Sequence, residues 1–159
     1  MKDVYWIERT GLAIVMRPRG DGELEEDLIR LKIAGIQTLI STVEDWEAGE
    51  LGLANERVIA ERLGFHFISY PMQDRSTPSN REDFSRFVKS LATLLEAGER
   101  IGVHCRGCIG RSTVVTACTL ITMGWSAKDA LHAIAVARAF PVPDTDEQRA
   151  WILAFGTKR

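Results

Sequence analysis

The amino-acid sequence predicts an α/β fold in which a central, mostly parallel sheet is flanked by helices. Short apolar runs rich in branched and aromatic residues recur along the chain, and segments with a helical period of apolar residues lie between them. This alternation is typical of a sheet covered by helices on both faces. In such folds, ligands bind beyond the carboxyl ends of the strands.

Strands and helices are predicted to alternate through the first two thirds of the chain. Four short apolar runs predict buried strands at residues 12–16, 38–42, 65–70 and 101–104. One-sided apolar stripes predict helices at residues 24–33, 55–63 and 84–95. In the first helix, Leu24, Leu28 and Leu31 share one face. Residues 19–23 and 49–52 contain glycine, and we expect both to be loops.

The C-terminal part of the chain is predicted to be helical. Residues 112–123 and 126–138 form the first two helices, and a last helix begins near Asp146. Two prolines break the chain between the second and the third. Because no repeat, low-complexity run or linker interrupts the sequence, we expect one domain that spans residues 1–159.

Charge and composition exclude several function classes. Twenty basic and 22 acidic side chains give a formal charge of -2, so no global field attracts nucleic acid or an anionic membrane. Charged residues near the N-terminus interrupt any signal-peptide core, and no apolar stretch is long enough to cross a bilayer. Three cysteines without an export signal suit a reducing compartment. We therefore expect a cytoplasmic protein with no nucleic-acid or membrane partner.

The most informative segment covers residues 101–113, where a predicted strand leads through a glycine-containing loop into a helix. A loop curled at a helix N-terminus can point successive backbone N–H groups at an anion, and the helix dipole adds positive potential there. Gly107 and Gly110 are expected to permit this curl. The sequence therefore predicts a local anion site.

Three side chains around this loop favour phosphate chemistry. Cys105 ends the strand, where the loop amides and the helix dipole are expected to lower the pKa of its thiol and favour the nucleophilic thiolate. Arg111 can fold back over the loop and hold two phosphate oxygens with its planar guanidinium group. Ser112 places a hydroxyl near the sulfur.

The order of His104, Cys105, five further residues, Arg111 and Ser112 resembles the active-site signature of the protein tyrosine and dual-specificity phosphatases. Such a match is highly specific because it also lies in the strand–loop–helix context that the chemistry requires. The resemblance implies the dual-specificity phosphatase fold and a protein-tyrosine or dual-specificity phosphatase activity, that of a phosphoric monoester hydrolase.

Two further segments resemble the small dual-specificity branch of this family, which includes the kinase-associated phosphatases. Residues 70–74 are similar to its general-acid loop, which makes Asp74 the expected acid. Residues 142–151 are similar to a segment that helps to close the site. The whole resemblance covers roughly residues 12–151.

The resemblance assigns roles to individual residues. The catalytic residues are Cys105, Arg111, Asp74 and Ser112, and the substrate-binding residues are Arg106, Gly107, Cys108, Ile109, Gly110 and Arg111. His104 is expected to order the loop. Gln148 either positions water or is a surface residue at a helix start.

The implied mechanism proceeds through a cysteinyl-phosphate intermediate and uses no metal or cofactor. The expected partner is a phosphorylated protein, with phosphotyrosine, phosphoserine or phosphothreonine as the substrate group. Spacing along the sequence does not give the depth of the pocket, so the choice among these groups and non-protein phosphates stays open, as does the oligomeric state.

Other interpretations of these residues remain. Asp74 could form a turn or a cap, in which case Asp83 would be the acid. Cys105 and Cys108 form a C-x-x-C pair typical of thioredoxin-like redox sites, and a rhodanese-type sulfur transferase also holds a cysteine in an anion-binding loop. A zinc site at His104, Cys105 and Cys108 lacks a fourth ligand. A phosphate-binding module without turnover is an alternative of another class.

Overall fold

A computed structural model describes residues 2–157, so residues 1, 158 and 159 of the predicted domain lie outside the described range. Within that range one sheet has the strand order β1-β2-β5-β3-β4. The four strands β2 (Leu12–Val15), β5 (Ile101–His104), β3 (Thr38–Ser41) and β4 (His66–Ser69) are parallel neighbours, which confirms the mostly parallel sheet. The antiparallel edge strand β1 (Val4–Trp6) was not predicted.

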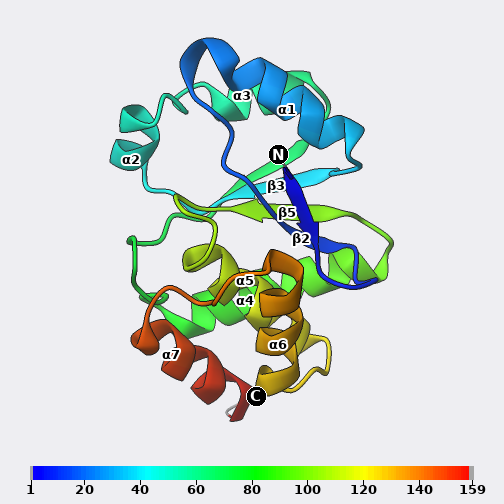
Figure 1. Ribbon diagram of the computed structural model, residues 1–159, viewed down its shortest axis with the longest axis vertical. Coiled ribbons are helices and arrows are strands. Elements are labelled where there is room, and N and C mark those ends of the chain that lie inside the picture. Colours follow the sequence, from blue (N-terminus) through cyan, green and yellow to red (C-terminus); the bar gives the residue numbers. More distant parts are fainter. Residues whose placement is uncertain (1, 158–159) are drawn as a thin grey trace.

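Helices cover both faces of the sheet (Figure 1). On one side lie α1 (Leu24–Ile33), α2 (Asp45–Glu50) and α3 (Glu56–Arg62). On the other lie α4 (Arg81–Glu96), α5 (Arg111–Thr122), α6 (Ala127–Arg138) and α7 (Asp146–Thr157). A short 3-10 helix, η1 (Asp21–Glu23), precedes α1.

Each face of the sheet has its own apolar core, because successive side chains of a strand point to opposite faces. In β2, Leu12 and Ile14 pack into the core that α4, α5, α6 and α7 share, whereas Ala13 and Val15 pack into the core beneath α1 and α3. All four residues are fully buried. Strands covered on both faces appear as continuous apolar runs, which is why the sequence revealed them.

Two predicted boundaries are wrong. Residues 49–52 are not all loop, because α2 extends to Glu50; its start is fixed by a reciprocal pair of hydrogen bonds between Glu44 and Glu47. Helix α4 begins at Arg81 rather than at residue 84, because the side chain of Asn80 accepts a hydrogen bond from the backbone N–H of Asp83 at 2.9 Å.

The sheet brings distant loops together at the carboxyl ends of its strands. The parallel register aligns Ser41 of β3 with His104 of β5 and Ser69 of β4. From β5 the chain enters α5, whose residues 111–121 are all buried. The predicted anion loop, between β5 and α5, therefore lies where α/β folds bind ligands.

Between residues 2 and 157, no helix is both long enough and apolar enough to cross a membrane.

Candidate active site

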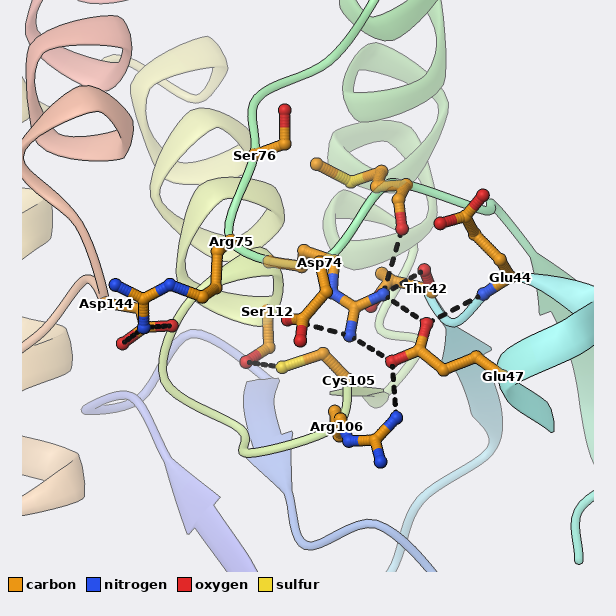
Figure 2. Close-up of polar contacts among 12 residues, drawn as sticks. Thr42, Glu44, Glu47, Asp74, Arg75, Ser76, Cys105, Arg106, Ser112 and Asp144 are labelled. Carbon is orange, nitrogen blue, oxygen red and sulfur yellow. Dashed lines mark hydrogen bonds and ion pairs between the residues drawn. The ribbon is translucent and has the colours of Figure 1, made fainter. Parts of the chain in front are cut away.

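The loop of residues 105–110, called here the phosphate loop, joins β5 to α5 and surrounds the sulfur of Cys105. The backbone N–H of Cys108 donates to this sulfur at 3.1 Å, and the hydroxyl oxygen of Ser112 lies 3.3 Å from it (Figure 2). Only 2% of Cys105 is exposed. The loop thus brings Cys105 and Ser112 together as the sequence predicted.

The left-handed residue of the phosphate loop is Cys108 rather than a glycine. Cys108 has a left-handed backbone with φ of 61°, whereas neither Gly107 nor Gly110 has a positive φ. Gly110 is instead needed for a close approach, since a Cβ atom there would lie 3.0 Å from Cβ of Asp144 and 3.1 Å from Nε2 of Gln148. Gly110, with φ of -101° and ψ of -84°, also lies outside the regular helical and extended regions, so the expectation that glycine permits the curl stays a prediction.

The three cysteines are free thiols with different electrostatic surroundings. The pKa of Cys105 lies well below its usual range, because hydrogen bonds from Cys108 and Ser112 and the charge of Arg111 together outweigh burial. Interaction with Cys105 and burial raise the pKa of Cys108, and burial raises that of Cys118. Cys105 is therefore the thiol favoured to ionise, and the thiolate is the nucleophilic form.

Arg111 is buried at the base of the site and is already paired with a carboxylate. Its Nη1 and Nη2 donate to the two oxygens of Glu47 at 2.8 and 2.7 Å, and Nη1 also donates to the carbonyl of Met72 at 2.9 Å. Its Nε has no hydrogen-bond partner within residues 2–157. A buried donor without a partner is costly, so this N–H is available to an anion.

Glu47 is a site residue that the sequence analysis missed. It is fully buried on α2, and Nη1 of Arg106 lies 3.6 Å from its Oε2. Burial alone would raise the pKa of Glu47, but hydrogen bonds from Arg111 and from the backbone N–H of Glu44 lower it. The spacing of Glu44 and Glu47 was the available signal, since it matches a capping box except for glutamate at the cap.

Asp74 lies on the loop of residues 71–80, called here the Asp74 loop, and its carboxylate faces Arg111. Its Oδ1 is 3.1 Å from Nη2 of Arg111, and its side chain is 44% exposed (Figure 2). Asp74, Cys105, Arg111 and Ile109 line one pocket of about 200 Å³. The structure therefore brings the predicted acid to the predicted nucleophile.

The alternative acid, Asp83, lies elsewhere. It accepts a hydrogen bond of 2.6 Å from the hydroxyl of Tyr70 and lies 3.6 Å from Arg86. Asp83 and Tyr70 line a different pocket, on the side of the Asp74 loop that faces Glu44. The geometry favours Asp74 over Asp83.

The segment before α7 and the start of α7 each contact the Asp74 loop. Nη1 of Arg75 lies 3.1 Å from both carboxylate oxygens of Asp144, as Figure 2 shows. Nε2 of Gln148 donates to the carbonyl of Ser76 at 2.9 Å. Gln148 is fully buried at the start of α7, which excludes the interpretation of Gln148 as a surface residue.

His104 is buried behind the phosphate loop. Its Nε2 lies 2.7 Å from Oε2 of Glu56, and its Nδ1 lies 3.3 Å from the carbonyl oxygen of Cys105. Burial lowers the pKa of His104, but the carboxylate of Glu56 outweighs it and the pKa is raised. This placement fits an ordering role.

Among residues 2–157, no group of three or more His, Cys, Asp or Glu side chains could hold a metal ion.

Comparison with known families decides the classification. The profile of the family described as "Polymorphic toxin system, DSP-PTPase phosphatase" matches residues 13–125. The chain belongs to this family. In this DSP-PTPase phosphatase, the matched residues include Asp74 and the whole phosphate loop. The match ends before Gln148.

Relatives and structural neighbours agree with this classification. Protein 067L of Invertebrate iridescent virus 3, whose name places it among the tyrosine phosphatases, is 34% identical over 113 residues, which cover 69% of this chain and 44% of the relative. Cyclin-dependent kinase inhibitor 3 of Rattus norvegicus is 28% identical over 98 residues, which cover 62% of this chain and 46% of that protein. The chain thus spans less than half of these two relatives.

A crystal structure of kinase associated phosphatase, with its catalytic-site cysteine replaced by serine, shares the fold. It aligns with a TM-score of 0.85 and 21% identity over 98% of this chain and 93% of its own. The predicted dual-specificity phosphatase fold is therefore confirmed for this DSP-PTPase family member.

Proposed function

We propose that this protein is a cysteine-dependent phosphatase that hydrolyses phosphomonoesters through a cysteinyl-phosphate intermediate. One observation carries the proposal: a thiol with a strongly lowered pKa lies in the same pocket as Arg111, whose buried Nε has no partner. Thiolate and guanidinium group together provide a nucleophile and a clamp for phosphate oxygens. Family membership supports the same activity.

In the first step, the thiolate of Cys105 attacks phosphorus and forms an S–P bond while the ester P–O bond breaks. Asp74 gives its proton to the departing oxygen. The bound phosphate takes the place of the Asp74 carboxylate at Nη2 of Arg111. The other backbone N–H groups of the phosphate loop and the side chain of Arg111 bind the remaining oxygens, while the N–H of Cys108 donates to the sulfur.

In the second step, water attacks phosphorus and the S–P bond breaks. Asp74 accepts a proton from this water, and the hydroxyl of Ser112, 3.3 Å away, stabilises the departing thiolate. Gln148 and His104 support these groups. Gln148 holds the Asp74 loop by its hydrogen bond to the carbonyl of Ser76. His104 contacts the carbonyl oxygen of Cys105, at the start of the phosphate loop. The proposed route uses no metal or cofactor.

The proposed substrate is a phosphorylated protein side chain, phosphotyrosine included. The two arginines at the pocket, Arg75 and Arg106, already face the carboxylates of Asp144 and Glu47. They therefore add little free positive charge for a second phosphate group, which disfavours highly charged inositol phosphates. Rates of phosphate release from phosphopeptides, phosphoinositides and triphosphorylated RNA test this choice, and a preference for either of the last two would contradict it.

Two broader expectations belong to the same proposal. The phosphatase domain spans residues 1–159, and it works in a reducing compartment such as the cytoplasm, without nucleic-acid or membrane partners. Three free thiols support the reducing compartment. Detection of the protein by a specific antibody in fractionated cells tests the location, and its presence in an oxidising compartment would contradict the proposal.

The proposal is tested with an aryl phosphate and the variant Cys105→Ser. Turnover should fall below detection, because serine lacks the ionised sulfur, and a chelator should leave the wild-type rate unchanged. Cys118→Ala removes a buried thiol outside the pocket and serves as the control. Substantial turnover by Cys105→Ser, or loss of wild-type activity on chelation, would rule out the cysteinyl-phosphate route.

A binding module without turnover is the alternative from another class. Cys105, Arg111, Ser112 and Asp74 are all present in one site, which favours the enzyme. Phosphate binding by the wild type with no release from any ester would favour the module.

A further inference from the structure

Two arginines hold the phosphate loop from its outer side. Nη1 of Arg17 donates to the carbonyl oxygen of Arg106 at 2.9 Å, and Nε of Arg138 donates to that of Cys108 at 3.0 Å. We infer that Arg17 and Arg138 are positioning residues that fix the loop N–H groups toward the phosphate. The inference rests on the proposed function, in which this loop binds the phosphoryl group.

The geometry of the peptide bond carries the first step. In a trans peptide the C=O and N–H groups point in opposite directions. The peptides from Arg106 to Gly107 and from Cys108 to Ile109 are trans, since the cis bond within residues 2–157 lies elsewhere. With both carbonyls held by arginines outside, the N–H groups of Gly107 and Ile109 are directed inward. The intervening N–H of Cys108 already donates to the Cys105 sulfur.

The backbone of Cys108 gives a second reason. A left-handed, non-glycine residue is strained and persists where its surroundings fix it. All three polar groups of Cys108 are bonded: its N–H to Cys105, its thiol to the carbonyl of Val15 at 3.1 Å, and its carbonyl to Arg138. Arg138 therefore supplies one of the three contacts that keep this residue in its unusual conformation.

Charge gives a third reason. Arg75, Arg106 and Arg111 each face a carboxylate. Arg17 and Arg138 form no ion pair with any carboxylate of residues 2–157. Their positive charges next to the loop are not neutralised, so they favour a bound anion as well as the loop conformation.

The N-terminal strand contributes to this support. The guanidinium carbon of Arg138 lies 4.4 Å from the centre of the Tyr5 ring, and Tyr5 pairs with Ile14 in the sheet. Both Tyr5 and Arg138 lie outside residues 13–125, which the family profile matches. The outer support of the loop therefore depends partly on segments beyond that profile.

The test measures binding of inorganic phosphate by calorimetry in the Cys105→Ser background, where turnover plays no part. Arg17→Met and Arg138→Met should each weaken phosphate binding about tenfold, the scale of one lost hydrogen bond from a charged donor. Arg17→Lys and Arg138→Lys should recover part of the loss, because lysine keeps the charge and one donor. Arg19→Met is the matched control, since Arg19 pairs with Asp27 and Glu23 instead of the loop.

A merely structural role would lower the melting temperature of the Met variants and leave the phosphate affinity of the folded protein unchanged. That result would overturn the inference. If a Met variant does not fold, Tyr5→Leu tests the position of Arg138 more gently, because it removes the ring that packs on the guanidinium group. Phosphate affinity should then fall about twofold to threefold, the scale of a cation–π contact. A phosphate affinity equal to that of the parent in Tyr5→Leu, Arg17→Lys and Arg138→Lys would likewise overturn it.

Failure of the proposed function gives a different pattern. A protein that binds phosphate through Arg17 and Arg138 yet releases none from any ester supports the positioning role and contradicts the enzyme. A wild type that turns over an aryl phosphate, with Met variants that bind phosphate like the parent, contradicts the positioning role alone.

Discussion

The phosphate loop and the Asp74 loop face the same sulfur atom but are held in different ways. The phosphate loop lies between a buried strand and a buried helix. Arginine side chains hold the carbonyls of Arg106 and Cys108, and the N–H of Cys108 donates to the sulfur. The Asp74 loop carries an exposed acid. The side chain of Arg75 ties this loop to Asp144, before α7, and the side chain of Gln148 ties it to the start of α7. The proposed phosphate site is thus preorganised. The proposed proton donor is instead placed by side-chain contacts, which break at a lower free-energy cost.

The comparison predicts its largest effect at Asp74. If Asp74 gives a proton to the departing oxygen, Asp74→Asn should slow hydrolysis of alkyl and tyrosyl phosphates on the order of 10²–10⁴-fold, the usual scale of general-acid catalysis. Activated aryl esters should slow much less, because their leaving oxygen bears negative charge well. Rates across a leaving-group series measure this dependence.

The matched variant for this series is Asp83→Asn, which removes the other candidate acid and its contact with Tyr70. It should slow all substrates by a similar, small factor. Uniform slowing for Asp74→Asn together with a steep leaving-group dependence for Asp83→Asn would show that Asp83, not Asp74, is the acid.

The second prediction concerns the buried ion pair that supports the phosphate loop. Glu47→Gln leaves the buried charge of Arg111 without its bidentate partner, so unfolding free energy should fall by about 3 kcal/mol and phosphate affinity should fall as well. Denaturant unfolding and calorimetry measure the two effects. The exposed Glu50→Gln, on the same helix, should change neither. A fully stable Glu47→Gln protein with normal affinity would contradict this account of the clamp.

The third prediction concerns pH. Because the pKa of Cys105 is lowered in the folded protein, its thiolate persists as the pH falls below the ordinary thiol range and is lost only below the lowered pKa. Cys108 and Cys118, whose pKa values are raised, stay protonated over that range. Iodoacetate at neutral pH should therefore alkylate Cys105 selectively.

Peptide mapping by mass spectrometry after a short exposure locates the label, and Cys105→Ser serves as the blank. Label on Cys108 at a comparable rate, or a Cys105 rate that rises only in the ordinary thiol range, would show that the loop does not stabilise the thiolate.

The smallest effect is expected at the contact between the Asp74 loop and the segment before α7. Asp144→Asn removes the partner of the exposed Arg75, and exposed ion pairs contribute little, so kcat should fall about twofold to fivefold with an unchanged KM. This loss should vanish in the Asp74→Asn background, because the contact acts through Asp74. Asp146→Asn, close by and exposed, is the control.

Most of the fold could be predicted from the sequence because its strands are buried on both faces and its helices have one apolar side. The edge strand β1 escaped prediction, since Val4–Trp6 is only three residues long and lies between charged residues. Helix α2 escaped because six residues containing a glycine and three acids have no apolar stripe. Short elements like these are fixed by tertiary contacts rather than by local pattern.

The same distinction separates the predicted site residues from the missed ones. Cys105, Arg111 and Ser112 lie close together in the sequence, so the motif revealed them. Glu47 is 64 residues from its partner Arg111, and Arg17 is 89 residues from the carbonyl that it binds. Neither pairing has a local signal. A single sequence gives the reacting groups here, and only the folded sheet gives the groups that hold them.

The assembly of the phosphate site from distant loops has a thermodynamic consequence. An unfolded chain has no curled loop and no buried guanidinium group, so under the proposed function inorganic phosphate binds the native state alone. By mass action, phosphate at a hundred times its dissociation constant would add about 2.7 kcal/mol to the free energy of unfolding. The product of the proposed reaction would then be both a competitive inhibitor and a stabiliser, and the choice of buffer anion would set the apparent activity and the melting temperature in opposite directions.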